Sequence, residues 1–189
     1  MALTKSIEIA NKMELLRSHG ITRKKSQMKT RSLSDGRDWY YEQVDLGFNY
    51  RMTDIQAALG ISQMNRIEHY ITKRNELADR YDNLLDPLPL TTPSRQKDSL
   101  SSFHLYVILL DKAEIRDEIF SFLRKKGIGV NVHYIPVHTQ PYYKGLGFEV
   151  GDYPKAELYY SKAMSLPLFP TMTQQEQDFV VKELRKALV

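Results

Sequence analysis

A hydrophobic pattern with helical spacing extends from Thr53 to about Leu85, and three prolines follow it between residues 87 and 93. Apolar side chains three and four residues apart form one face of an α-helix. Proline ends a helix because it lacks the backbone N–H and clashes with the preceding turn. The pattern therefore predicts a long helix over residues 53–85, with a second folding unit from residue 86 to the end.

The second half alternates between strand and helix signals. Phe103–Leu110 and Ile128–Tyr134 are typical of strands, the latter because Ile and Val alternate with Gly, Asn and His. Asp111–Glu114 and Thr173–Glu176 are capping-box patterns that each open a helix. Together these signals predict an α/β unit over residues 86–189, with a small antiparallel sheet packed by helices.

Further helix signals complete this reading. Gly127 is expected to close the first of these helices, and Pro154 fits the first turn of a short helix to about Met164. In the last helix we expect an inward face of Phe179, Val180, Leu184 and Leu188. Before the long helix, Ser6 to Ser18 predicts an amphipathic helix, and residues 21–44 have no sustained period.

The composition is that of a soluble globular protein, with 42% hydrophobic and 26% charged residues in 189. The apolar runs are too short to span a bilayer, and Met1–Lys5 lacks the apolar core of a signal peptide. The chain has no cysteine, which excludes disulfides and a cysteine nucleophile. These features fit a cytoplasmic protein with no membrane contact.

A polar, glycine-broken loop carrying Asn49 and Arg51 leads into the long helix, with Thr53 or Asp54 as the cap. An amide and a guanidinium held at a helix N-terminus suit an anion such as phosphate. The alternative to anion binding is that Asn49 is an ordinary turn residue and Arg51 an ordinary surface residue beside the cap. Beyond the cap, the helix carries an apolar face of Ile55, Ala58 and Leu59.

His133 and His138 are the other candidates for chemistry. His133 ends a predicted strand, and Pro136 turns the chain back before His138, so both are expected to face one concavity with Tyr134. A metal pair is disfavoured because no carboxylate lies close by and the intervening proline prevents i,i+4 helical geometry. Each histidine alone is often a structural residue.

The amino-acid sequence of four blocks, in the same order along the chain, resembles that of the DegT/StrS family of nucleotide-sugar aminotransferases, which depend on pyridoxal phosphate. Within that family the wording is closest to the transaminases that aminate a 4-keto nucleotide sugar on the route to pseudaminic acid. The blocks are Leu15–Arg23, Asp45–Gly60, Val132–Tyr143, and Ala156–Glu157 with Ser165–Thr173.

The resemblance implies the small carboxy-terminal domain of a fold type I enzyme over residues 86–189. Residues 1–52 would be a remnant of the large cofactor domain, and residues 53–85 the connecting helix. The Schiff-base lysine of the family would lie upstream of Met1, so no catalytic residue is expected here and the chain alone is predicted to be inactive. Lys5 is expected to be a surface residue at the start of a helix.

The resemblance also implies roles for the candidate residues. Asn49, and secondarily Arg51, would reach the cofactor phosphate of the other subunit in a homodimer. His133, Tyr134 and His138 would contact the substrate. The implied partners are a keto nucleotide sugar and an amino-acid donor, usually glutamate. The alternative from a different functional class is a non-catalytic fragment that lacks the lysine and serves for dimerisation or interaction.

A basic stretch in the first forty residues leaves a weaker alternative open. It suits a nucleic-acid patch, a solvated loop, or a site for the diphosphate of a nucleotide sugar. It lacks interleaved aromatic residues, which favours the solvated loop over nucleic acid. Its charges are Arg17, Arg23, Lys24, Lys25, Lys29, Arg31 and Arg37, opposed by Asp35.

Overall fold

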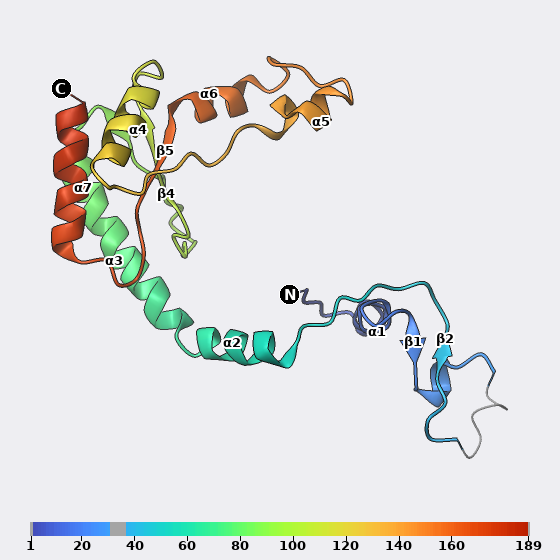
Figure 1. The fold of residues 1–189 in the computed structure, drawn as a ribbon. Helices are drawn as coiled ribbons and strands as arrows, with labels where there is room; N and C mark the ends of the chain where they lie inside the picture. Colours follow the sequence, from blue (N-terminus) through green and yellow to red (C-terminus); the bar gives the residue numbers. More distant parts are fainter. Residues whose placement is uncertain (1, 31–36, 189) are drawn as a thin grey trace. The chain divides into compact units, whose positions relative to one another are not determined.

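A computed structural model describes residues 2–30 and 37–188 (Figure 1). Arg31 and Asp35 of the basic stretch lie outside the described residues. The chain divides into two compact units, Met1–Met64 and Asn65–Val189. Within the described part, no helix is both long enough and apolar enough to cross a membrane.

The first unit begins with helix α1, Ile7–Leu16, which the Ser6 hydroxyl caps by accepting the N–H of Ile9 at 3.3 Å. The predicted helix at Ser6–Ser18 is therefore present, one turn shorter. Strands β1, Ile21–Thr22, and β2, Glu42–Gln43, pair antiparallel. They were missed because a two-residue strand has no period to detect. A 3₁₀ turn η1, Lys25–Gln27, follows β1.

The predicted long helix is two helices, α2, Asp54–Met64, and α3, Ile67–Leu85, separated by a turn at Asn65 and Arg66. The apolar spacing continues across this turn, so periodicity alone could not locate it. Gly60 lies inside α2 and does not break it.

The second unit is built on a three-stranded antiparallel sheet in the order β3–β4–β5. β3, Leu90–Thr91, pairs with the end of β4, Tyr106–Leu110, and β4 pairs along its length with β5, Ala163–Leu166. The expected start of β4 at Phe103 fails because Phe103 has φ +43°, outside strand geometry. The predicted α/β class and the antiparallel sheet are confirmed.

Helices pack around this sheet (Figure 1). α4, Arg116–Lys125, packs against β5 and against α7, Gln174–Ala187, and α7 also contacts α3. α6, Pro154–Lys162, contacts β4 and starts at the expected proline. A 3₁₀ turn η3, Val137–Thr139, and the short helix α5, Pro141–Lys144, form the connection before α6.

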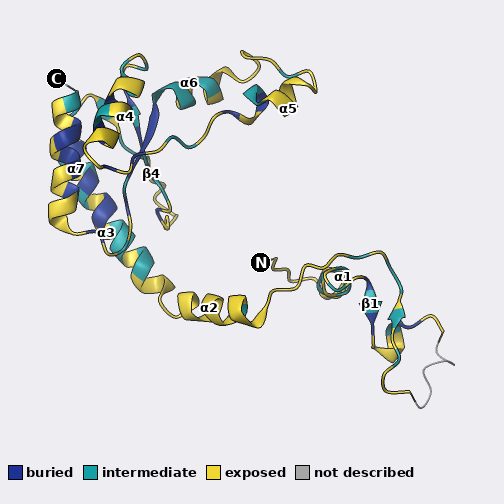
Figure 2. Ribbon diagram, in the orientation of Figure 1, coloured by how far each residue is buried: buried dark blue, intermediate teal, exposed yellow. Residues whose placement is uncertain are grey.

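The core of this unit lies between the sheet and the inner faces of α3, α4 and α7 (Figure 2). Helix α2, by contrast, is mostly exposed, with Ile55 84% and Leu59 61% accessible. Its predicted apolar face is therefore present but uncovered in this chain. The most completely buried core side chains are Ala78, Tyr81, Leu85, Tyr106, Ile108, Leu123, Met164 and Leu184.

Two local predictions in this unit are wrong. Residues 128–134 form no strand; Asn131 alone makes an isolated bridge with Ser165 of β5. The Asn131 side-chain oxygen accepts the N–H of Val132 at 2.8 Å, and the strand pairing with β5 ends there. The capping box at Asp111 is also absent, because the Asp111 N–H donates to Pro89 O at 3.2 Å and so extends the sheet.

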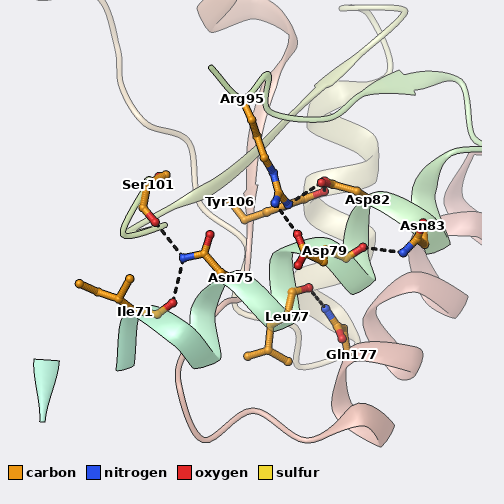
Figure 3. A network of polar contacts seen from close by, with 10 residues as sticks. All are labelled: Ile71, Asn75, Leu77, Asp79, Asp82, Asn83, Arg95, Ser101, Tyr106 and Gln177. Carbon is orange, nitrogen blue, oxygen red and sulfur yellow. Dashed lines mark hydrogen bonds and ion pairs between the residues drawn. The ribbon is translucent and has the colours of Figure 1, made fainter. Parts of the chain in front are cut away.

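Helix α7 confirms its predicted capping box, with Thr173 and Glu176 bonded reciprocally. Its inward face differs from the prediction because Phe179 is 45% exposed while Gln177 is fully buried. Gln177 is satisfied there, since its Nε2 donates to Leu77 O at 2.7 Å and its Oε1 accepts from Arg80 at 3.1 Å. Figure 3 shows the Gln177–Leu77 bond between α7 and α3.

Candidate functional site

The candidate anion-binding loop is held at both ends by specific bonds. At its start, the Asp45 carboxylate pairs with Lys12 and accepts the N–H of Leu46 at 2.9 Å. At its end, Thr53 caps α2: its hydroxyl accepts the N–H of Gln56, and the Gln56 side chain accepts the N–H of Thr53. Thr53, and not Asp54, is therefore the cap.

Two glycines let this loop lie directly against the segment that follows α1. A Cβ on Gly20 would lie 1.9 Å from Asp45 O, and one on Gly47 would lie 2.3 Å from Gly20 N. His19, beside them, has φ 64°, a strained conformation for a residue with a side chain. The His19 N–H donates to Phe48 O at 2.8 Å, so backbone bonds hold the two segments together.

The structure places Asn49 and Arg51 on the surface of this loop, as expected. Both side chains are exposed, and neither has a hydrogen bond or ion pair within the described residues. The Asn49 backbone is fixed by a bridge to Ser18. Arg51 lines a cavity of about 550 Å³ together with Arg23. An amide and a guanidinium without protein partners fit the phosphate of a cofactor.

Every lysine lies within the described residues and none of them is buried; Lys5 is an exposed residue just before the α1 cap, as predicted. A lysine that attacks a carbonyl carbon needs a desolvated environment that lowers its pKa. A phosphate role for Asn49 and Arg51, and the absence of a lysine that holds a cofactor covalently, stay predictions.

On the candidate substrate side, His133 and His138 have separate partners. The His133 Nδ1 bonds the Ser165 hydroxyl of β5 at 2.7 Å, and its Nε2 lies 3.4 Å from the Asn131 amide nitrogen. Because an amide nitrogen only donates, His133 carries its proton on Nδ1 and donates it to Ser165. Its neighbour Tyr134 is 68% exposed.

His138 is buried, and its Nε2 donates to Glu157 Oε1 of α6 at 2.8 Å. The same oxygen accepts the Gly151 N–H at 2.7 Å. These two bonds lower the pKa of Glu157, the Gly151 N–H more than the imidazole. His138 also packs on the Tyr153 ring at 4.8 Å between centroids.

The structure therefore brings the five predicted residues together only in part. Asn49 and Arg51 share one loop, while the two histidines lie on the Asn131–Gly151 segment with different partners. A common concavity for His133, Tyr134 and His138 stays a prediction. Glu157 and Ser165 were missed as partners, although both lie in the family-like blocks quoted above. Among the described residues, no group of three or more His, Asp or Glu could hold a metal ion.

Comparison with known sequences gives one family match, to the DegT/DnrJ/EryC1/StrS aminotransferase family over residues 1–185. The spore coat polysaccharide biosynthesis protein SpsC of Bacillus subtilis is 36% identical over 98% of this chain and 48% of its own. The UDP-4-amino-4,6-dideoxy-N-acetyl-beta-L-altrosamine transaminase of Campylobacter jejuni is 36% identical over 92% of this chain and 43% of its own. The chain thus spans about half the length of these relatives.

Solved structures agree. Helicobacter pylori PseC, an aminotransferase of pseudaminic acid biosynthesis, superposes with a TM-score of 0.85 at 30% identity, covering 98% of this chain and 47% of that one. A putative sugar aminotransferase of Streptococcus pneumoniae in its PMP-form gives a TM-score of 0.86 at 29% identity, over 97% of this chain and 46% of that one.

Proposed function

Since the chain belongs to the DegT/DnrJ/EryC1/StrS aminotransferase family, whose cofactor is pyridoxal phosphate, we propose that it is part of an enzyme that aminates a keto nucleotide sugar. The amino group would come from an amino acid, with glutamate as the proposed donor. The finer proposal is a 4-keto sugar, supported by the named activity of the Campylobacter relative and by PseC. A cytoplasmic location, supported by the cysteine-free sequence, is part of the proposal.

One observation carries the cofactor half of this proposal: the exposed, unpartnered donors of Asn49 and Arg51 on the loop before the Thr53 cap. The loop backbone is anchored at both ends, so anion binding has to order only the two side chains and not the loop itself. In a homodimer, Asn49 and Arg51 would hold the cofactor phosphate of the partner subunit. When bound, the cofactor supplies the electron sink for amino transfer.

The substrate half rests on His133, Tyr134 and His138. The Ser165 hydroxyl holds the His133 ring, the Asn131 amide nitrogen sets its tautomer, and Tyr134 beside it is exposed. Glu157 holds His138 and thereby the path of the connection between η3 and α6. We propose that His133 and Tyr134 contact the sugar, and that His138 keeps their loop in place.

A chimera tests this proposal. The matching part of the Campylobacter transaminase would be replaced by this chain, and amino-sugar product measured with pyridoxal phosphate, glutamate and a UDP-linked 4-keto sugar. We expect an active chimera, with Asn49→Ala weakening cofactor binding by about tenfold to a hundredfold, since a lost bond to a charged group costs about 1.5–3 kcal/mol. Lys5→Ala, on an exposed lysine outside the loop, is the matched control.

Two outcomes would contradict the proposal. A folded chimera that binds the cofactor but makes no amino sugar would refute the proposed keto nucleotide-sugar substrate. Normal cofactor binding by Asn49→Ala and Arg51→Gln together would refute the phosphate role. If the chain only dimerises and never supports cofactor binding, the interaction-fragment reading takes its place.

A further inference from the structure

A hollow of about 550 Å³ lies between helices α3 and α7 of the second unit (Figure 1). The two helices run side by side there, since the Gln177 amide of α7 donates to Leu77 O of α3 at 2.7 Å. The hollow opens about one turn further along both helices. Its lining residues are Leu84, Asp178, Val181, Lys182, Arg185 and Lys186.

This hollow has an apolar floor and a charged rim. Val181 is buried and Leu84 is half-buried, whereas the four charged lining residues are exposed. The aliphatic stems of lysine and arginine side chains add apolar surface below their charged ends. Such a pattern suits an amphipathic segment, whose apolar side chain contacts the floor while its charged side chains meet the rim.

Both carboxylates of α7 beside the hollow are already paired with protein cations. Asp178 pairs with Arg80 of α3 at 2.6 Å, and the buried Glu183 pairs with Lys186 at 2.6 Å. Within the described part of the chain, no carboxylate other than that of Asp178 lines the hollow. The rim therefore has no free anion for its remaining cations.

Those remaining cations are Lys182 and Arg185, which make no hydrogen bond or ion pair with any described residue. Lys182 acts on Glu183 only at longer range. The two cations are three residues apart on α7, a spacing at which like charges repel each other. The negative end of the helix dipole stabilises Arg185 in the last turn, but Lys182 lies before that turn. Carboxylates of a bound segment would remove this repulsion.

We propose that the hollow between α3 and α7 docks an acidic amphipathic segment of a partner protein. An apolar side chain of that segment contacts Leu84 and Val181, and its carboxylates meet Lys182 and Arg185. Charge complementarity selects the acidic partner. A nucleic acid would use the two cations but not the apolar floor, so the floor favours a peptide. This inference does not rest on the proposed amino transfer.

Fluorescence anisotropy of a labelled helical peptide, titrated with the 189-residue chain, tests the site. The peptide carries leucines on one face and glutamates on both sides of that face. We expect this leucine peptide to bind. The same peptide with alanine in place of leucine, or with lysine in place of glutamate, should bind at least about tenfold more weakly. Single-stranded DNA should not compete with the leucine peptide.

Variants of the rim give effects of opposite sign. Lys182→Gln and Arg185→Gln should each weaken the leucine peptide by about threefold, and the double variant by about tenfold. Asp178→Asn removes the carboxylate of the rim and should strengthen binding by about twofold. Lys155→Gln, on an exposed lysine of α6 outside the hollow, is the matched control and should leave binding unchanged. Circular dichroism checks that each variant folds.

Equal binding of the leucine and alanine peptides would show general electrostatic attraction and overturn the site. A loss in Lys155→Gln equal to that in Lys182→Gln, or weaker binding in Asp178→Asn, would do the same. Sedimentation of the chain alone tests a second copy as the occupant. Self-association that the double variant abolishes would replace the partner protein by another copy of this chain.

The chimera separates this inference from the proposed function. If the chimera makes amino sugar but does not bind the leucine peptide, the rest of the enzyme covers the hollow, so the docking site fails and the function stands. If the chimera binds the peptide but makes no amino sugar, the docking site stands and the function fails.

Discussion

One carboxylate oxygen, Oε1 of Glu157, accepts both the imidazole proton of His138 at 2.8 Å and the backbone N–H of Gly151 at 2.7 Å. His138 lies before α5 and Gly151 after it, so Glu157 of α6 holds both ends of the connection that contains α5. His138 is buried, and a glutamine at position 157 would keep an acceptor oxygen but lose the negative charge that strengthens both bonds.

We therefore expect Glu157→Gln to lower the melting temperature by about 3 °C and to speed hydrogen exchange over residues 139–156. Because the folded-state pKa of Glu157 is lowered, its contribution is present above the ordinary glutamate pKa and is lost as pH falls through the folded value. Glu149→Gln, an exposed residue on the same connection, is the control. Unchanged exchange in Glu157→Gln would contradict the prediction.

Tyr106 in β4 donates its hydroxyl proton to Asp82 of α3 at 2.5 Å, and Arg95 bridges Asp82 and Asp79 (Figure 3). Tyr106→Phe should cost about 1–2 kcal/mol in the free energy of unfolding by denaturant, since the bond is to a charged group. Tyr142→Phe, on a side chain that is 73% exposed, should be near neutral. Equal losses in both variants would refute this reading of the network.

Alkaline pH should also destabilise the fold through Tyr81 and Tyr106. Burial is the main cause that raises the pKa of both phenols, so each stays protonated in the folded state while the unfolded tyrosine ionises near pH 10. The free energy of unfolding should fall as pH rises above about 10. Tyr106→Phe should reduce that slope, and an identical slope would argue against it.

Gly20→Ala and Gly47→Ala should each disrupt the first unit, because the new Cβ would lie 1.9 Å and 2.3 Å from backbone atoms. A loss of more than about 2 kcal/mol is expected, with faster hydrogen exchange in β1 and β2. Gly60→Ala is the matched control, since nothing lies within 4 Å of its Cβ position in α2. Alanine there should stabilise by about 0.5–1 kcal/mol.

The 189-residue chain by itself is expected to be inactive as a transaminase. None of its lysines is buried, so none has the desolvated, aligned amine that the reaction needs. The assay combines the chain with pyridoxal phosphate, glutamate and a nucleotide keto sugar. A borohydride-fixed cofactor adduct at one defined lysine, together with amino-sugar product, would overturn this prediction.

Local signals in the sequence were sufficient wherever one turn of chain decides the structure. The capping box at Thr173 and Glu176, the closing Gly127 with φ 79°, and Pro154 at the start of α6 all follow from bonds within a few residues. The same reasoning predicted the Thr53 cap and the exposure of Asn49 and Arg51 on the loop before it, while anion binding by this loop stays a prediction.

Tertiary structure decided what depends on distant partners. The Asp111 N–H bonds Pro89 O and extends the sheet, and the Asn131 backbone bridges Ser165 of β5. Gln177 is buried because Leu77 and Arg80 of α3 satisfy its amide. The cavity of Arg23 and Arg51 likewise exists because two glycines far apart in sequence allow their backbones to meet. Hydrogen bonding within one turn is encoded by spacing, whereas close approach and burial depend on which segments the fold brings together.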